Sequence, residues 1–169
     1  MSDKNITVNG KNNIYKINRM IYEKCNVKKD KSEMIDIKYY NINEQINLIN
    51  DKTSEIYKNV SEEIKQKLSS YKQQDKNKNR YDVNMFITYD DIIELLQSTL
   101  CKCYYCKNNM CILYEYKNEK KQWTLDRINN DLGHNTNNVV CSCLGCNIQK
   151  RKRDHDKFLF TKTLVIDKI

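Results

Sequence analysis

Two Cys-x-x-Cys pairs are the residues whose spacing points most directly to chemistry. Cys103 and Cys106 form the first pair and Cys143 and Cys146 the second, with 36 residues between the pairs. Each pair can present two sulfurs from one turn, and four thiolates are the ligand set of a structural zinc ion. We therefore predict that these four cysteines bind zinc. Spacing leaves three alternative ligands: Cys101, Cys111 and Cys141.

Side chains suited to a second, harder cation lie between and just after these pairs. Asp126, His134 and Asn138 lie between the pairs, and Asn147 directly follows the last cysteine. Carboxylate and carboxamide oxygens are ligands for Mg²⁺ or Mn²⁺, and such an ion can also bind phosphate. The predicted zinc ion would hold this second set of groups in position.

The order of these motifs resembles that of the HNH (ββα-metal) endonuclease family. Within the family it is similar to the variants of phages and large DNA viruses in which four cysteines bind zinc. The motifs that carry the resemblance are Cys103-x-x-Cys106, Leu125-Asp-Arg-Ile128, Gly133-His134, Asn138-Val-Val140, Cys143-x-x-Cys146-Asn147 and a basic run. The resemblance covers the C-terminal half of the chain. It implies a hairpin followed by a helix, which together hold one divalent ion against a scissile phosphate.

The resemblance also implies a role for each residue of the site. Asp126 matches the metal-binding acid, Asn138 the amide that steadies the loop, and Asn147 the ligand on the helix. Where most members carry the general-base histidine, this chain has Arg127, which can clamp a phosphate through two hydrogen bonds. The base must then come from elsewhere, and His134 is one candidate; its alternative roles are to structure the loop or to bind phosphate.

Positive charge is concentrated in the half of the chain that carries these motifs. The net charge is +8, and residues 101–169 hold 13 Lys and Arg against 7 Asp and Glu. This distribution favours a polyanionic partner: DNA, with RNA as an alternative. We expect His155 to be a surface residue or a phosphate contact. The predicted nucleic-acid-binding residues are Lys150, Arg151, Lys152 and Arg153.

The cysteines also bear on the compartment. The chain has eight of them, and its N-terminus lacks the apolar segment of a secretory signal. We therefore expect zinc ligation in an intracellular, reducing compartment (cytoplasm, nucleus or virus-infected host cell) instead of disulfides. The sequence contains no run of about 18 apolar residues, so we do not expect a membrane span. Cys25 is expected to be an ordinary buried thiol.

The elements that must position the site predict an α+β fold. Residues 1–80 are expected to form a mostly helical extension and residues 81–169 the zinc-containing HNH-like ββα module. Within the extension, apolar residues recur at helical spacing over 14–21 and over 42–71. The second stripe predicts one long amphipathic helix, or two helices broken near Asn50-Asp51. It could pair with a second copy in a homodimer or pack along the module.

Local signals define the remaining elements. Residues 72–81 contain no aliphatic side chain and are predicted to be a linker. A helix is expected to start at Thr88, because a threonine three residues before Asp91 forms a capping box. Residues 112–116 and 122–126 have the composition of short strands.

Three functions follow from these features. The first is a metal-dependent DNA endonuclease of HNH type, with a structural Zn²⁺ and a catalytic Mg²⁺ or Mn²⁺. The second is a catalytically inactive nucleic-acid-binding protein derived from the same module, as Arg127 would allow. The third is a zinc-containing interaction module that uses the amphipathic stripe.

Overall fold

The computed structural model describes residues 9–14, 28–29 and 35–164. Two predictions lie outside this part of the chain: the helix over 14–21, apart from Ile14, and the buried thiol of Cys25.

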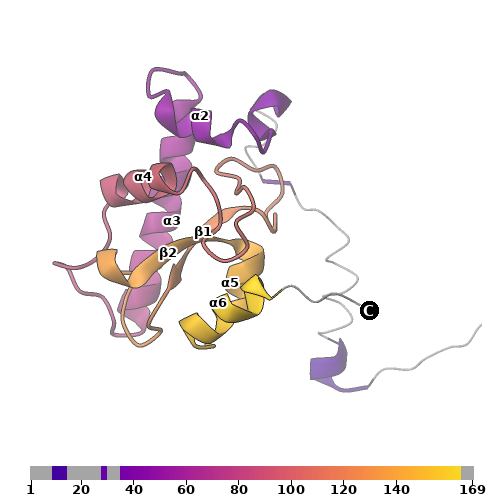
Figure 1. The fold of residues 1–169 in the computed structure, drawn as a ribbon, viewed down its shortest axis with the longest axis vertical. Coiled ribbons are helices and arrows are strands. Elements are labelled where there is room, and N and C mark those ends of the chain that lie inside the picture. Colours follow the sequence, from indigo (N-terminus) through magenta and orange to yellow (C-terminus); the bar gives the residue numbers. More distant parts are fainter. Residues whose placement is uncertain (1–8, 15–27, 30–34, 165–169) are drawn as a thin grey trace, which may run out of the picture.

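The described elements confirm an α+β protein (Figure 1). A 3-10 helix, η2 (Ile37–Tyr40), precedes three α-helices: α2 (Gln45–Asn50), α3 (Tyr57–Asn77) and α4 (Tyr89–Ser98). The C-terminal part contains strand β1 (Trp123–Arg127), the 3-10 helix η3 (Thr136–Asn138), strand β2 (Val139–Cys143), and helices α5 (Leu144–Lys150) and α6 (His155–Thr163). Two strands and a helix therefore follow one another in the C-terminal part of the described chain.

The amphipathic stripe forms two helices, the second of the two alternatives that its sequence allows, and the break lies near Asn50-Asp51. α2 ends at Asn50, and α3 begins at Tyr57. Ile49, Val60 and Ile64 have no exposed surface and belong to the same core cluster as residues of α4 and β1. Burial of these side chains within their own chain stabilises the fold through the hydrophobic effect. These residues of the stripe therefore pack along the module, one of the two predicted arrangements.

The predicted linker over 72–81 is wrong for its first half, because α3 continues to Asn77. Lysine and glutamine are good helix formers, so the absence of aliphatic residues does not end the helix. Asp75, in the last turn of α3, is completely buried. Residues from both sides of position 80 share one core.

α4 begins as its sequence predicts. The Thr88 side chain accepts a hydrogen bond from the Asp91 backbone N–H, and the Asp91 carboxylate accepts one from the Thr88 N–H. These two bonds satisfy backbone donors that a helix N-terminus leaves unpaired.

β1 and β2 form an antiparallel hairpin in which Asp126 lies opposite Val140 and Trp123 opposite Cys143. The strand predicted over 112–116 does not form. The backbone N–H groups of Ile112 and Leu113 instead donate to Gln45 Oε1, at 2.8 and 3.0 Å. A fully buried side chain of α2 thus takes the place of a neighbouring strand.

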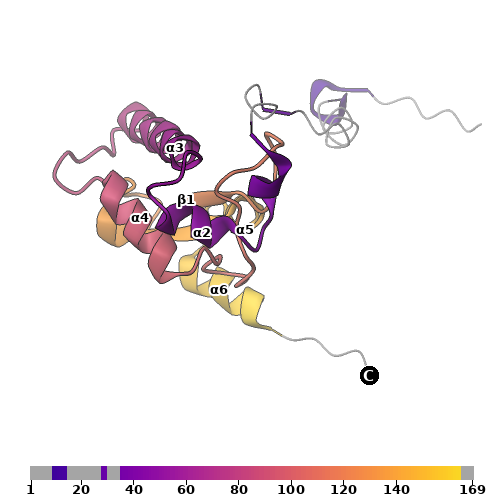
Figure 2. The same ribbon diagram turned by 90° about the horizontal axis from the view of Figure 1, so that it is seen from above.

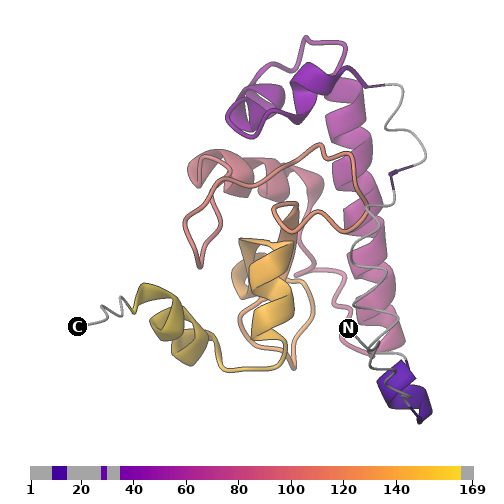
Figure 3. The ribbon, with the colours of Figure 1, turned by 90° about the vertical axis from the view of Figure 1, so that its right-hand side faces the viewer.

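The hairpin lies between α3 on one side and α5 with α6 on the other (Figures 2 and 3). The Tyr71 hydroxyl of α3 accepts a hydrogen bond from the Leu125 N–H, and Asn147 of α5 donates to Thr124. The two faces of β1 therefore carry separate sets of polar side chains.

None of the described helices has the length and apolar composition that a membrane crossing needs.

Candidate functional site

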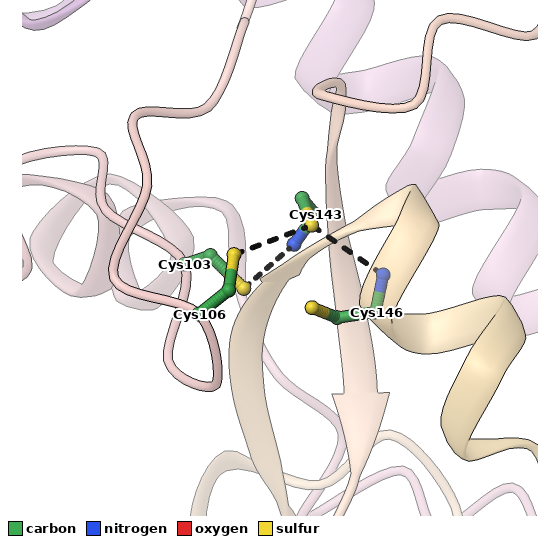
Figure 4. A group of neighbouring side chains, drawn as sticks. All are labelled: Cys103, Cys106, Cys143 and Cys146. Atoms are coloured by element: carbon green, nitrogen blue, oxygen red, sulfur yellow. Dashed lines mark hydrogen bonds between the residues drawn. The ribbon is translucent and has the colours of Figure 1, made fainter. Parts of the chain in front are cut away.

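The four predicted zinc ligands come together. The sulfurs of Cys103, Cys106, Cys143 and Cys146 all lie within 4.8 Å of one another (Figure 4). The first two come from the loop after α4, Cys143 ends β2, and Cys146 lies in the first turn of α5. The cluster therefore ties the loop to the point where the hairpin continues into the helix.

The spacing of the sulfurs fits a tetrahedral zinc ion. Cys106 Sγ and Cys143 Sγ are 3.9 Å apart. A Zn–S bond of about 2.3 Å in tetrahedral geometry separates neighbouring sulfurs by about 3.8 Å. Cys103 Sγ accepts a hydrogen bond from the Cys143 N–H at 3.2 Å. A hydrogen bond from the Cys143 thiol and bonds from backbone N–H groups lower the pKa of Cys103, which favours the thiolate that binds metal.

The alternative ligands do not join the cluster of four. Cys101 and Cys111 are buried thiols, and burial raises the pKa of Cys101 to about 12 and of Cys111 to about 11. Burial also raises the pKa of Cys141 above its ordinary value. Neutral thiols of this kind pack as small apolar groups.

Asp126 lies on the face of β1 that is covered by α5 and α6. Its Oδ2 accepts a hydrogen bond from the Tyr105 hydroxyl at 2.6 Å and lies 3.2 Å from Lys150 Nζ. Its Oδ1 is 3.5 Å from the same Nζ, beyond the usual range of a hydrogen bond. Asp126 is 5 % exposed. Oδ2 is thus held by Tyr105 and Lys150, whereas Oδ1 has only the longer contact with Lys150.

Asn147 approaches the same strand from α5. Its Nδ2 donates to Thr124 Oγ1 at 3.0 Å and to the Leu125 carbonyl at 3.2 Å, just before Asp126 in the chain. Its Oδ1 makes no hydrogen bond with the described residues. The amide is therefore fixed by its nitrogen, and its oxygen is left without a hydrogen bond to the described residues.

Arg127 and His134 lie on the opposite face of β1, against α3. His134 Nδ1 is 2.9 Å from both carboxylate oxygens of Asp75, and Arg127 Nη1 is 3.9 Å from Asp75 Oδ1. The His134 ring also packs on the Tyr71 ring, with centroids 4.5 Å apart. Since neighbouring strand residues point to opposite faces, Asp126 and Arg127 cannot line one site. The structure therefore does not bring Arg127 and His134 to the Asp126 face.

Asn138 holds the connection between the strands. Its Nδ2 donates to the carbonyls of Asn129 and Gly133, each at 2.9 Å, and its Oδ1 accepts from the Asn129 N–H at 2.8 Å. Asn138 is buried and uses both ends of its amide within the loop. It acts as the loop-steadying amide, and none of these bonds involves a site for metal or phosphate.

The predicted basic run divides into two parts. Arg151, Lys152 and Arg153 are exposed on the turn between α5 and α6. Lys150 has no exposed surface; its Nζ pairs with Asp126 and donates to the Arg127 carbonyl at 2.8 Å. The prediction that Lys150 binds nucleic acid is therefore corrected, because the ammonium faces inward.

Three residues in the hydrogen-bonded groups around Asp126 and Asp75 were not predicted, or were wrongly predicted, from the sequence. Asp75 continues the spacing of the apolar stripe, four residues after Tyr71, and a polar residue in such a position is a signal for a buried anchor. Tyr105 lies inside the first cysteine pair, where nothing in the sequence indicates its bond to Asp126. His155, expected at the surface, is 9 % exposed and lies 3.0 Å from the Tyr105 hydroxyl through Nδ1.

Compared with protein-family models, with curated proteins and with solved structures, the chain matches none of them.

Proposed function

We propose that this protein is a metal-dependent endonuclease that hydrolyses phosphodiester bonds in DNA, with its catalytic site on the Asp126 face of the hairpin. The observation that carries the proposal is the approach of Asn147 to β1 beside Asp126. Strand and helix thereby bring a carboxylate and a carboxamide to the same face, each with an oxygen free of a strong hydrogen bond. Two such oxygens are hard ligands that suit Mg²⁺ or Mn²⁺.

In this proposal Asp126 Oδ1 and Asn147 Oδ1 hold the divalent cation. When bound, the cation supplies positive charge that stabilises the phosphate in the transition state and makes a bound water more acidic. Tyr105 and Lys150 orient the carboxylate through its other oxygen. The exposed Arg151, Lys152 and Arg153 bind the phosphates that flank the scissile bond.

The four-cysteine cluster, when it binds zinc, helps to hold this site in position. Cys143 and Cys146 fix the junction of β2 and α5, one residue before Asn147. Because a bound zinc ion restrains the first turn of α5, it also restrains the orientation of Asn147 relative to β1.

A plasmid assay tests the proposal. Wild-type protein with a full zinc content is expected to convert supercoiled DNA to nicked or linear product in Mg²⁺ or Mn²⁺. Asp126→Asn and Asn147→Ala should each reduce the rate at least 100-fold, the order expected for the loss of a group that acts in the transition state. Asp156→Asn, which removes an exposed carboxylate from α6, is the matched control and should cleave normally. A zinc-loaded wild type that cleaves in neither metal contradicts the proposal.

The second candidate is a nucleic-acid-binding protein without catalytic activity. Lys150 supports it, because its ammonium already neutralises the carboxylate that would bind the catalytic cation. Arg127 supports it as well, because the position after the acid carries no base and faces Asp75. This candidate predicts that every form binds DNA at low salt and none cleaves it.

A further inference from the structure

His155 is the only histidine on the Asp126 face of the hairpin; the chain's other histidine, His134, lies on the α3 face. It is the first residue of α6 and follows the exposed basic turn 151–153 by one residue. Its ring packs on Tyr104 and Tyr105, with centroids 5.3 and 5.6 Å away. The imidazole is therefore held in one orientation at the edge of the basic surface.

The hydrogen bonds around Tyr105 determine which nitrogen of His155 carries a proton. The Tyr105 hydroxyl carries a single proton. That proton is donated to Asp126 Oδ2 at 2.6 Å, since a carboxylate paired with Lys150 can only accept. The Tyr105 oxygen must then accept from Nδ1 of His155 at 3.0 Å. In the neutral imidazole Nδ1 holds the proton, and Nε2 has a free lone pair.

Nε2 of His155 is also accessible to solvent. Within the described part of the chain, the fully buried side-chain nitrogens and oxygens without a hydrogen-bond partner are Trp123 Nε1 and Asn135 Oδ1. His155 Nε2 has no hydrogen-bond partner there and is not one of these buried atoms. It therefore reaches the surface, two hydrogen bonds away from Asp126 and beside the basic turn.

We propose that His155 is the general base of the hydrolysis and that Tyr105 is the residue that positions it. This inference rests on the proposed endonuclease function and assigns a residue that the sequence motifs do not. Nε2 takes a proton from a water molecule, and the water oxygen forms a bond to phosphorus. The bond from phosphorus to the leaving sugar oxygen breaks, the electron pair stays on that oxygen, and solvent protonates it. His155 then returns its proton to solvent.

His134 provides the contrast. It is buried to a similar degree and is also oriented by a carboxylate, but that carboxylate is Asp75 on the α3 face. The groups that surround His155 are Tyr104 and Tyr105 from the cysteine loop, with Asp126 and Lys150 behind Tyr105. Only His155 is thus connected to the proposed cation ligand.

Single-turnover cleavage with histidine variants tests the assignment. In His155→Ala the rate should fall at least 100-fold, because general-base catalysis typically contributes 10²–10⁴-fold. Imidazole added to the reaction should restore part of that rate, which it would not do if the side chain only stabilised the fold. His134→Ala serves as the matched control: it should not gain rate from imidazole. Zinc content and DNA affinity are measured for each variant.

A second pair of variants protects the test against misfolding. His155→Asn keeps a donor near the position of Nδ1 but has no base, and should retain zinc and DNA binding while losing cleavage. Tyr105→Phe removes both hydrogen bonds but leaves the ring, and should lower kcat about 10-fold or more with KM unchanged. The assignment is overturned if His155→Asn cleaves within threefold of the rate of an active wild type. It is also overturned if imidazole restores cleavage in His134→Ala but not in His155→Ala. A wild type that never cleaves overturns the proposed function itself, and the assignment falls with it.

Discussion

The buried carboxylate of Asp75 binds His134 through both the backbone and the side chain. Asp75 Oδ2 accepts from the His134 N–H at 2.6 Å, and Nδ1 of the ring lies 2.9 Å from each carboxylate oxygen. The end of α3 is thereby joined to the connection between the strands. The two residues are 59 positions apart in the chain, so this contact fixes the hairpin connection to the helical part of the protein.

This contact predicts that stability falls as the pH drops below neutrality. Burial lowers the pKa of His134, and the Asp75 carboxylate only partly opposes this effect. The unfolded chain, with an ordinary pKa of about 6.5, therefore binds a proton before the folded chain does. The free energy of unfolding should decrease as the pH falls below about 6.5 towards the lower folded-state pKa. Urea unfolding at a series of pH values measures this slope.

His134→Asn is the matched variant for that experiment. Its amide nitrogen can donate to Asp75 from nearly the same position, but it does not titrate. The slope between pH 5 and 7 should therefore be smaller in the variant than in the wild type. Equal slopes would show that His134 does not account for the pH dependence.

Gly133 is required because the chain passes very close to the end of α3. A Cβ at this position would lie 2.4 Å from the Arg80 carbonyl oxygen and 3.0 Å from Asp75 Oδ2. Gly133→Ala should lower the free energy of unfolding by about 1–3 kcal/mol, the range for overpacked sites. In the control, Gly145→Ala, the new Cβ would be 3.5 Å from the Lys120 carbonyl oxygen, an ordinary contact. Chemical denaturation should find the control within about 1 kcal/mol of wild type.

Two lysines that look equivalent in the sequence should behave differently when changed to methionine. Lys150 is buried against Asp126, so Lys150→Met leaves a buried carboxylate without its partner and should cost about 3–5 kcal/mol. Lys152 is exposed, so Lys152→Met should change stability by less than about 0.5 kcal/mol. Its effect should appear in DNA binding, as a salt dependence of log K that is shallower by about 0.9. Equal stability of the two variants would argue against the buried ion pair.

Removal of zinc should unfold the C-terminal part of the chain. The four sulfurs connect the loop before β1 to the end of β2, and folding free energy in such sites depends on the metal. Elemental analysis should find one zinc per chain in the wild type and in Cys111→Ser, whose thiol lies outside the cluster. Cys146→Ser should lose the metal. With the metal chelated, the melting temperature should fall by roughly 10 °C or more, which corresponds to a few kcal/mol.

The sequence was sufficient where one local rule decides the structure. Cysteine spacing identified the sulfur cluster, and the Thr88 capping box located the start of α4. Both depend on neighbouring residues and on chemistry that few other residue types supply. The break between α2 and α3 was one of two alternatives that the sequence left open.

The sequence did not predict the features that depend on contacts between residues far apart in the chain. Lys150 was indistinguishable from its three basic neighbours, because only the fold places Asp126 beneath it. The strand expected over 112–116 depended on a partner, and Gln45 occupies that place. Asp75 was assigned to a linker because residues 72–81 are polar. It is buried because the loop that contains His134, 59 residues later in the chain, covers it.

The alternation of charge along β1 has a consequence for the pairing of the hairpin. If β1 were shifted by one residue, every side chain would exchange faces. A shift in one direction would bring Arg127 to the place of Asp126 beside Lys150, and a shift in the other direction would bring Asp126 to the place of Arg127 beside Asp75. Either shift therefore brings like charges together in one buried cluster. A double variant that exchanges Asp126 and Arg127 would bring like charges together in the native pairing and should therefore have a lower free energy of unfolding.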